Sequence, residues 1–166
     1  MARLRTGVAF AAALLVVALT GPGAVRDAPA AEQLCRVSKL SQPIPGRPSF
    51  NFGNARIAVG LPRGARFLAV PDGRPGDAFI QEDGWVRAKL GWFSARGAPT
   101  VTGRRVDGTD GRLRAEIGPL SNGAGSGLFY PSLLYFPAFG CWRISATAGG
   151  AHLSAVVIVA RSTHRG

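Results

Sequence analysis

The sequence predicts an all-β protein, built as an antiparallel sandwich or barrel, and two observations predict it. Glycine occurs 23 times and proline 12 times in 166 residues, and no stretch of normal helix length has an apolar period of 3.6 residues. Short runs of strand-forming residues recur instead, at intervals of roughly 8 to 15 residues, with Gly-rich turns between them.

Residues 1–30 have the composition of a signal peptide. Arg3 and Arg5 form a positively charged start, and the apolar run at 7–21 is too short to span a bilayer with its flanks. Ala-Pro-Ala at 28–30 offers small residues for cleavage. We expect cleavage after residue 30 and a secreted or cell-envelope location; an uncleaved signal anchor is the alternative and would be the only attachment to a membrane.

The rest of the chain divides into an extended segment, one domain and a tail. Segment 31–53 has three prolines between 43 and 48, which predicts an extended, irregular course. Residues 54–162 carry all the strand-like runs and are enough for one β-sandwich domain with a real core. Residues 163–166 form the tail.

The predicted strands follow one another along this domain. They are the runs at 55–61, 65–70, 84–93, 99–106, 111–117, 132–136, 141–148 and 151–161. The sequence DGTDG at 107–111 and the Gly-Gly pair at 149–150 are typical of hairpin turns, the second of a tight two-residue type.

Alternation of residue types predicts which face of each strand is buried. In the strand around Trp142, Trp142 and Ile144 share one face, and Cys141 and Arg143 share the other. Trp142 is therefore expected in the core and Cys141 on the outer face. The last strand reads AVVIV without alternation, which predicts that both of its faces are covered.

Cys35 and Cys141 are the only cysteines. In an exported chain such a pair favours a disulfide, and a bridge across 106 positions would contribute roughly 4 to 5 kcal/mol in the chain-entropy model. This bridge would clamp the Pro-rich segment over the outside of a sheet. Free or intermolecular thiols remain an alternative, and so does a metal site, although His152 and His164 are too scattered for a zinc set.

The chain is strongly basic. It has 20 Lys and Arg against 9 Asp and Glu, a formal net charge of +11, and loss of residues 1–30 would leave 17 basic and 8 acidic residues, or +9. On an exported protein this charge favours anionic partners such as wall polymers, lipid head groups or acidic glycans, and the compartment argues against nucleic acid. A solvated basic surface without a dedicated ligand is the simpler alternative.

The densest charge cluster is GRRVDGTDGRLR at 103–114. Arg104, Arg112 and Arg114 are expected to line one face of a hairpin, where guanidinium groups could bind phosphate or carboxylate in bidentate fashion. The alternative is a solvated face paired with Asp107, Asp110 and Glu116. The two aspartates supply too few oxygen ligands for a calcium loop.

Residues 118–131 are expected to form the longest loop of the domain. Such loops are often functional, and Asn122, Phe129 and Tyr130 would give it polar and aromatic contacts. The alternative is that an aromatic side chain packs down and anchors the end of the loop. Among the tryptophans, Trp92 and Trp142 are expected in the core and Trp85 at the surface.

Two stretches resemble a family of uncharacterised bacterial exported proteins and lipoproteins. The run LYFPAFGCWRISATAGG is similar to that family's FPTxGCWEVTG-type motif, and GRRVDGTDGRLRAEI is similar to its GRRLDxxxxPLRAxI pattern. The resemblance spans roughly residues 54–160 and rests on Gly103-Arg104-Arg105, Asp107, Leu113-Arg114-Ala115 and Gly140-Cys141-Trp142.

The resemblance implies an immunoglobulin-like β-sandwich of about seven to nine strands outside the cytoplasm, with no assigned activity. Three positions depart from the family pattern. Phe93 stands where a second Trp is usual, Ala124 stands near the place of a loop Tyr, and Arg143 replaces a Glu on the outer face. A function shared through that Glu or Tyr would be changed or lost here.

Catalysis finds little support in the sequence. There is no Gly-x-Ser-x-Gly elbow or paired-histidine motif, and only His152 is placed to be an ordered base. We therefore expect a non-enzymatic, cofactor-free and metal-free envelope domain that binds an anionic polymer or a protein. A secreted inhibitor acting through the 118–131 loop is one alternative, and a structural accessory domain is another.

Overall fold

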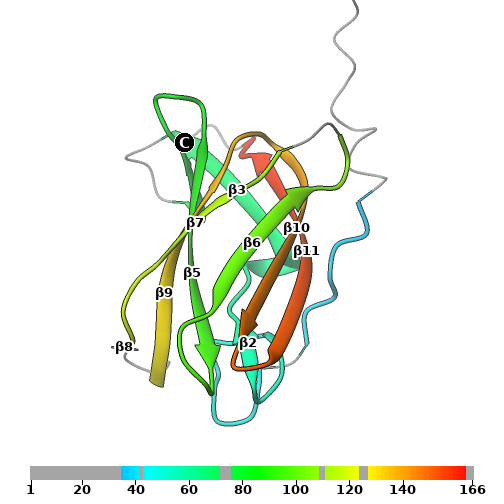
Figure 1. Ribbon diagram of the computed structural model, residues 1–166. Helices are drawn as coiled ribbons and strands as arrows, with labels where there is room; N and C mark the ends of the chain where they lie inside the picture. Colours follow the sequence, from blue (N-terminus) through cyan, green and yellow to red (C-terminus); the bar gives the residue numbers. More distant parts are fainter. Residues whose placement is uncertain (1–34, 42, 72–75, 109–110, 124–126, 164–166) are drawn as a thin grey trace, which may run out of the picture.

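The computed structural model describes residues 35–41, 43–71, 76–108, 111–123 and 127–163 (Figure 1). Over these residues the chain is all-β, as predicted, with eleven strands in one mixed sheet and a single 3-10 turn, η1 (Arg63–Ala65). No helix in these ranges is long and apolar enough to cross a membrane. The predicted signal peptide lies outside the described residues.

The strands match the predicted runs, and three short strands are additional. The eleven strands are β1 (Phe52–Gly53), β2 (Ile57–Val59), β3 (Arg66–Pro71), β4 (Ala78–Ile80), β5 (Val86–Ser94), β6 (Thr100–Arg105), β7 (Arg114–Ile117), β8 (Ser121–Gly123), β9 (Gly127–Phe136), β10 (Gly140–Ala148) and β11 (Ala151–Arg161). The expected count of seven to nine was too low because β1, β4 and β8 have only two or three residues each, too few to show a period.

The sheet follows the order β1-β2-β5-β4-β3-β11-β10-β6, and β9 pairs with β5, β7 and β8 off this path. Strands β5 and β9 run side by side in one layer, while β10 and β11 lie with β6 in another (Figure 1). Strand β3 joins the layers, because it pairs with β4 on one edge and with β11 on the other. We call these the β5–β9 layer and the β6–β10–β11 layer.

The sheet is not purely antiparallel, which corrects the expectation. Strand β3 runs parallel to both β4 and β11, with Phe67 beside Val159 and Val70 beside Phe79. The other ladders are antiparallel, including the β10–β11 hairpin at Gly149-Gly150, whose positive φ angles of 51° and 78° fit the predicted tight turn. Alternation assigns faces to a strand but carries no information about the direction of its partner.

The core lies between the two layers. Three rings make its centre: Phe136 of β9 lies 5.9 Å from Phe67 of β3 and 5.4 Å from Trp142 of β10, measured between ring centroids. Trp142 is fully buried, as alternation predicted, and its indole nitrogen donates a hydrogen bond to the carbonyl of Ala138. The layers are therefore joined by aromatic packing as well as by β3.

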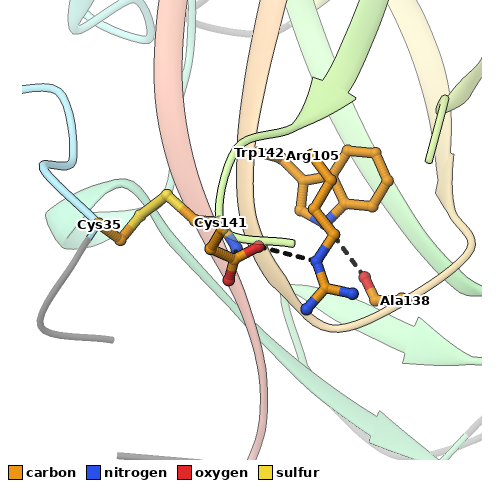
Figure 2. Close-up of polar contacts among 6 residues, drawn as sticks. Cys35, Arg105, Ala138, Cys141 and Trp142 are labelled. Atoms are coloured by element: carbon orange, nitrogen blue, oxygen red, sulfur yellow. Dashed lines mark hydrogen bonds and ion pairs between the residues drawn. A yellow bond between two sulfur atoms is a disulfide. The ribbon is translucent and has the colours of Figure 1, made fainter. Parts of the chain in front are cut away.

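The predicted disulfide is present. Cys35 and Cys141 are bonded, with their Cα atoms 5.8 Å apart (Figure 2). Cys141 lies on the face opposite Trp142, as expected, yet it is only 1% exposed. Beyond the bridge, the Ser38 amide donates to the carbonyl of Val156, and the Val156 amide donates to the Ser38 hydroxyl. The N-terminal segment thus pairs with the edge of β11 at Val156.

A buried carboxylate connects β6 to β10 beside the disulfide. Asp107, whose side chain is 3% exposed, accepts a 2.7 Å charged hydrogen bond from the Nε of Arg105 and a 2.8 Å bond from the backbone amide of Cys141 (Figure 2). The Val106 amide completes the connection by donating to the Cys141 carbonyl. Asp107 therefore closes an ion pair inside the protein and is not a solvated turn residue.

Two glycines make room for this arrangement. Gly140 has a φ of 131°, and a Cβ there would lie 2.7 Å from the Asp107 carboxylate. A Cβ on Gly103 would overlap the side chain of Leu113. Both glycines belong to the motifs that carry the family resemblance, and the structure places those motifs in one cluster.

Removing the disulfide tests the staple. We expect Cys35→Ala/Cys141→Ala to lower the free energy of unfolding by about 4 kcal/mol, because the bridge closes a loop across 106 positions. Urea unfolding of the oxidised wild type and the variant measures the difference. Non-reducing mass spectrometry gives the direct check, and finding both thiols free in the purified protein would contradict the assignment.

The Asp107 ion pair should matter far more than the surface ion pair between Arg114 and Glu116. Asp107→Ala leaves Arg105 and the Cys141 amide without an acceptor, and we expect a loss of about 3 kcal/mol. Glu116→Ala is the matched control, because its pair with Arg114 is exposed, and it should cost under about 1 kcal/mol. Equal midpoints in thermal or urea unfolding would show that the burial of Asp107 contributes nothing.

Candidate functional site

Three arginines from adjacent strands form a row on the outer face of the β6–β10–β11 layer. Arg143 of β10 lies directly opposite Arg104 of β6, and Arg104 in turn lies opposite Arg112 through an isolated antiparallel bridge. The bridge is held by the Leu113 amide, which donates to the Gly103 carbonyl, and the Arg105 amide, which donates to the Gly111 carbonyl. We call Arg112, Arg104 and Arg143 the arginine row.

The arginine row is exposed, and it has no carboxylate partner among the described residues; Asp110 lies outside them. All three side chains are exposed, and the ion pairs shown among the described residues involve Arg105 and Arg114 instead. Directly opposite residues in antiparallel strands have Cβ atoms about 5 Å apart, and like charges at that spacing repel each other. The row is therefore a site of concentrated positive charge that an anion would relieve.

A shallow groove of about 580 Å³ runs along the arginine row. It is lined by Val101, Thr102, Gly103, Arg104, Arg112, Leu113, Arg143 and Ser145. On the outer face Thr102 and Ser145 are short, and the long side chains that line the groove are those of Arg104, Arg112 and Arg143. A guanidinium can donate two parallel hydrogen bonds to one carboxylate or phosphate.

Beside the row, the same face carries mainly short polar groups, with Val156 opposite Arg143. Thr102 lies opposite Ser145, which lies opposite Ser154, and the Ser145 and Ser154 hydroxyls are 3.3 Å apart. One step further, Thr147 lies between Thr100 and an exposed His152. His152 lies near the start of β11 and points outward, because alternation from the buried Leu153 places it on the outer face. The face is flat and polar.

Arg114 belongs to the predicted set but not to the arginine row. Its guanidinium lies 4.2 Å from the centre of the Tyr135 ring and 3.6 Å from the Glu116 carboxylate. It is therefore partly neutralised at the start of β7, two residues beyond Arg112. The predicted set of Arg104, Arg112 and Arg114 is thus divided, and Arg143 takes the third place in the row.

The predicted 118–131 loop is mostly a hairpin, which corrects the expectation. Strands β8 and β9 pair through Ser121–Phe129 and Asn122–Leu128, and residues 124–126 at its tip lie outside the described residues. Asn122 is exposed, whereas Phe129 and Tyr130 are partly buried against apolar clusters. The two aromatic side chains anchor the hairpin. A loop was expected from the Gly and Ser residues of this segment, but β-pairing continues through them.

The tryptophans do not form a surface platform. Trp92 and Trp142 are buried, and the Trp92 indole donates to the hydroxyl of Ser132. Trp85 is half-buried beside the turn at 81–84. Within the described ranges, no group of three or more His, Cys, Asp or Glu side chains is gathered in a way that could hold a metal ion.

Sequence reasoning placed Arg143 on the outer face but did not pair it with Arg104. Only the register of β6 against β10 brings the two together, and register depends on the hairpin partners of both strands. The signal in the sequence was the alternation Arg143, Ser145, Thr147 on a strand whose other face is apolar.

No protein-family model, no curated protein and no solved structure matches the chain.

Proposed function

We propose that this protein is a non-enzymatic domain of the cell envelope that binds an anionic polymer through the arginine row. The observation that carries the proposal is the alignment of Arg112, Arg104 and Arg143 on three neighbouring strands, exposed and without a carboxylate partner among the described residues.

Cross-strand repulsion supports a ligand role for this row. Three cations in direct register make the unliganded face less stable than one with alternating charge. The sheet could relieve this through a carboxylate on a neighbouring strand, but the residue of β11 opposite Arg143 is Val156, and the next pair on this face is Ser145 and Ser154. Binding of anionic groups relieves the repulsion. Removal of this unfavourable interaction of the free protein therefore adds to the affinity.

The geometry also supports a polymer over a single small anion. Neighbouring strands are about 4.8 Å apart, so the three guanidinium groups emerge in a line across the strands. A chain with repeating carboxylate or phosphate groups can contact all three, and each extra contact is made at high effective concentration. The groove of about 580 Å³ is lined by all three arginines, so one bound chain could contact each of them.

Two finer assignments are part of the proposal. Export rests on the composition of residues 1–30, and the Cys35–Cys141 disulfide is compatible with an oxidising compartment. An immunoglobulin-like sandwich rests on the resemblance of the GRRVD and GCW motifs, and the two layers around Phe136 and Trp142 are compatible with it.

A secreted inhibitor is the second candidate, and it has one observation in its favour. Leu120 and Leu128, at the β8–β9 hairpin, are 51% and 54% exposed, more than the other large apolar side chains that the structure describes. A protein cleft could bury them. Phe129 and Tyr130, the residues first expected to make such contact, support the hairpin from below. A structural accessory domain would use neither surface.

Charge removal at the row tests the first candidate. We expect Arg104→Gln/Arg112→Gln/Arg143→Gln to bind purified wall polymer or polyuronate roughly tenfold more weakly at low salt, because three exposed charge contacts contribute about 0.5 kcal/mol each. Wild-type binding should weaken as salt rises, since the contacts are screened. Co-sedimentation at several salt concentrations measures both effects.

The matched control is Arg56→Gln/Arg63→Gln/Arg96→Gln. These three arginines are exposed and lie outside the row, and their replacement removes the same charge. If both triple variants bind equally well, only net charge matters and the row has no special role. Binding that persists at high salt and is lost in Leu120→Gln/Leu128→Gln would favour the inhibitor instead.

A further inference from the structure

The outer face of β9 is too apolar for a solvated strand. Alternation places Phe129, Pro131, Leu133 and Tyr135 on this face, while Ser132 and Leu134 point into the core between the layers. A sheet face that meets only water is normally polar. Something must cover these side chains, or the surface is kept apolar for a ligand.

The chain itself covers one end of this face. Phe129 packs with a small cluster made by Phe50, Ala58 and Phe93, to which Ile44 also belongs. The Phe50 and Phe93 rings are 6.2 Å apart, and the Arg47 guanidinium lies 3.3 Å from the centre of the Phe93 ring. The segment 44–50 is thus a lid over the Phe129 end, and it stops short of Leu133.

The uncovered part is a groove of about 610 Å³. It is lined by Phe79, Arg87, Lys89, Glu116, Ile117, Gly118, Pro131, Ser132 and Leu133. Pro131 and Leu133 form the floor, and Gly118, whose amide donates to the Pro131 carbonyl, adds no side chain above it. The volume lies within the range of small-molecule sites.

The charges around the groove favour an anion. Lys89 of β5 lies opposite Leu133 of β9, and Leu133 lies opposite Glu116 of β7, so an ammonium and a carboxylate flank the apolar floor. The carboxylate is already engaged: Glu116 accepts from the Tyr135 hydroxyl at 3.2 Å and lies 3.6 Å from Arg114. Lys89 is exposed and makes no ion pair with any described residue.

We propose that this groove binds an amphiphile with an acyl chain and an anionic head group. The chain lies on Pro131 and Leu133 beside Phe79, and the carboxylate or phosphate pairs with Lys89, beside Arg87. This site is separate from the arginine row, because it lies on the β5–β9 layer. In the sequence, Arg114 lies between Arg112 of the row and Glu116 of the groove. It requires no part of the polymer-binding proposal.

The sequence offers a sharp probe, because Lys39 and Lys89 are its only lysines. Reductive ¹³C-methylation keeps their charge and gives each a separate NMR signal. On titration with laurate below its micelle concentration, we expect the Lys89 signal to shift saturably and the exposed Lys39 signal to stay in place. Acetate, which supplies the head group alone, should shift neither.

Chain length and paired variants complete the test. Affinity should rise up to about fourfold for each added methylene between octanoate and laurate, as apolar burial requires. Leu133→Gln should weaken laurate at least tenfold, and Leu120→Gln, an exposed leucine outside the groove, should leave it unchanged. If Leu133→Gln fails to fold, Lys89→Gln against Lys39→Gln, followed by calorimetry, replaces it.

Several results would overturn the proposal. They are equal binding of acetate and laurate, equal shifts of both lysine signals, or laurate binding that disappears in the arginine-row variant and persists in Lys89→Gln. Co-sedimentation with phosphatidylglycerol vesicles separates the sources of the ligand. Pelleting that depends on Lys89 and Leu133 identifies a lipid surface, and laurate binding without pelleting identifies a free amphiphile.

Discussion

The Asp107 carboxylate is the interaction on which the surrounding structure depends. It lies just after β6, accepts from the amide of Cys141 at the start of β10, and is neutralised by Arg105. That single group fixes how β6 enters its pairing with β10, and this pairing places Arg104 opposite Arg143. It also fixes the backbone just before Cys141, and so the start of the strand that carries the disulfide and the core residue Trp142. A lost carboxylate would therefore disturb the staple, the core and the arginine row together.

The two outer faces differ in chemistry because the strands beneath them differ in their partners. The β6–β10–β11 face carries Thr, Ser and Arg and meets solvent, whereas β9 presents Pro131 and Leu133 on a face that segment 44–50 covers only at one end. Strand β7 connects these regions, since Arg112 just before it faces the first groove and Glu116 within it faces the second. The two outer faces differ in where their cations lie, more than in their net charge.

Local patterns in the sequence predicted the structural features that depend on residues close together along the chain. Alternation separated Trp142 from Cys141, and Gly149-Gly150 marked the turn before β11. The features it missed depend on partners far along the chain. The parallel course of β3 beside β11, the pairing of β8 with β9, and the contact of Asp107 with the Cys141 amide join segments whose register no local pattern contains. The arginine row was half visible for the same reason: Arg104 and Arg112 share a hairpin, but Arg143 comes from another.

The position of Ser38 has a consequence for the behaviour of the chain before folding is complete. Strand β11 has β10 on one edge, and β3 reaches the other edge only from Ile158 onward. Ser38 occupies the Val156 amide and carbonyl just before that point, and the nearby disulfide keeps it there. An unpaired edge on so apolar a strand is a template for joining another chain. The disulfide thus also protects this edge of β11 against self-association, and it does so only after the two cysteines have been oxidised.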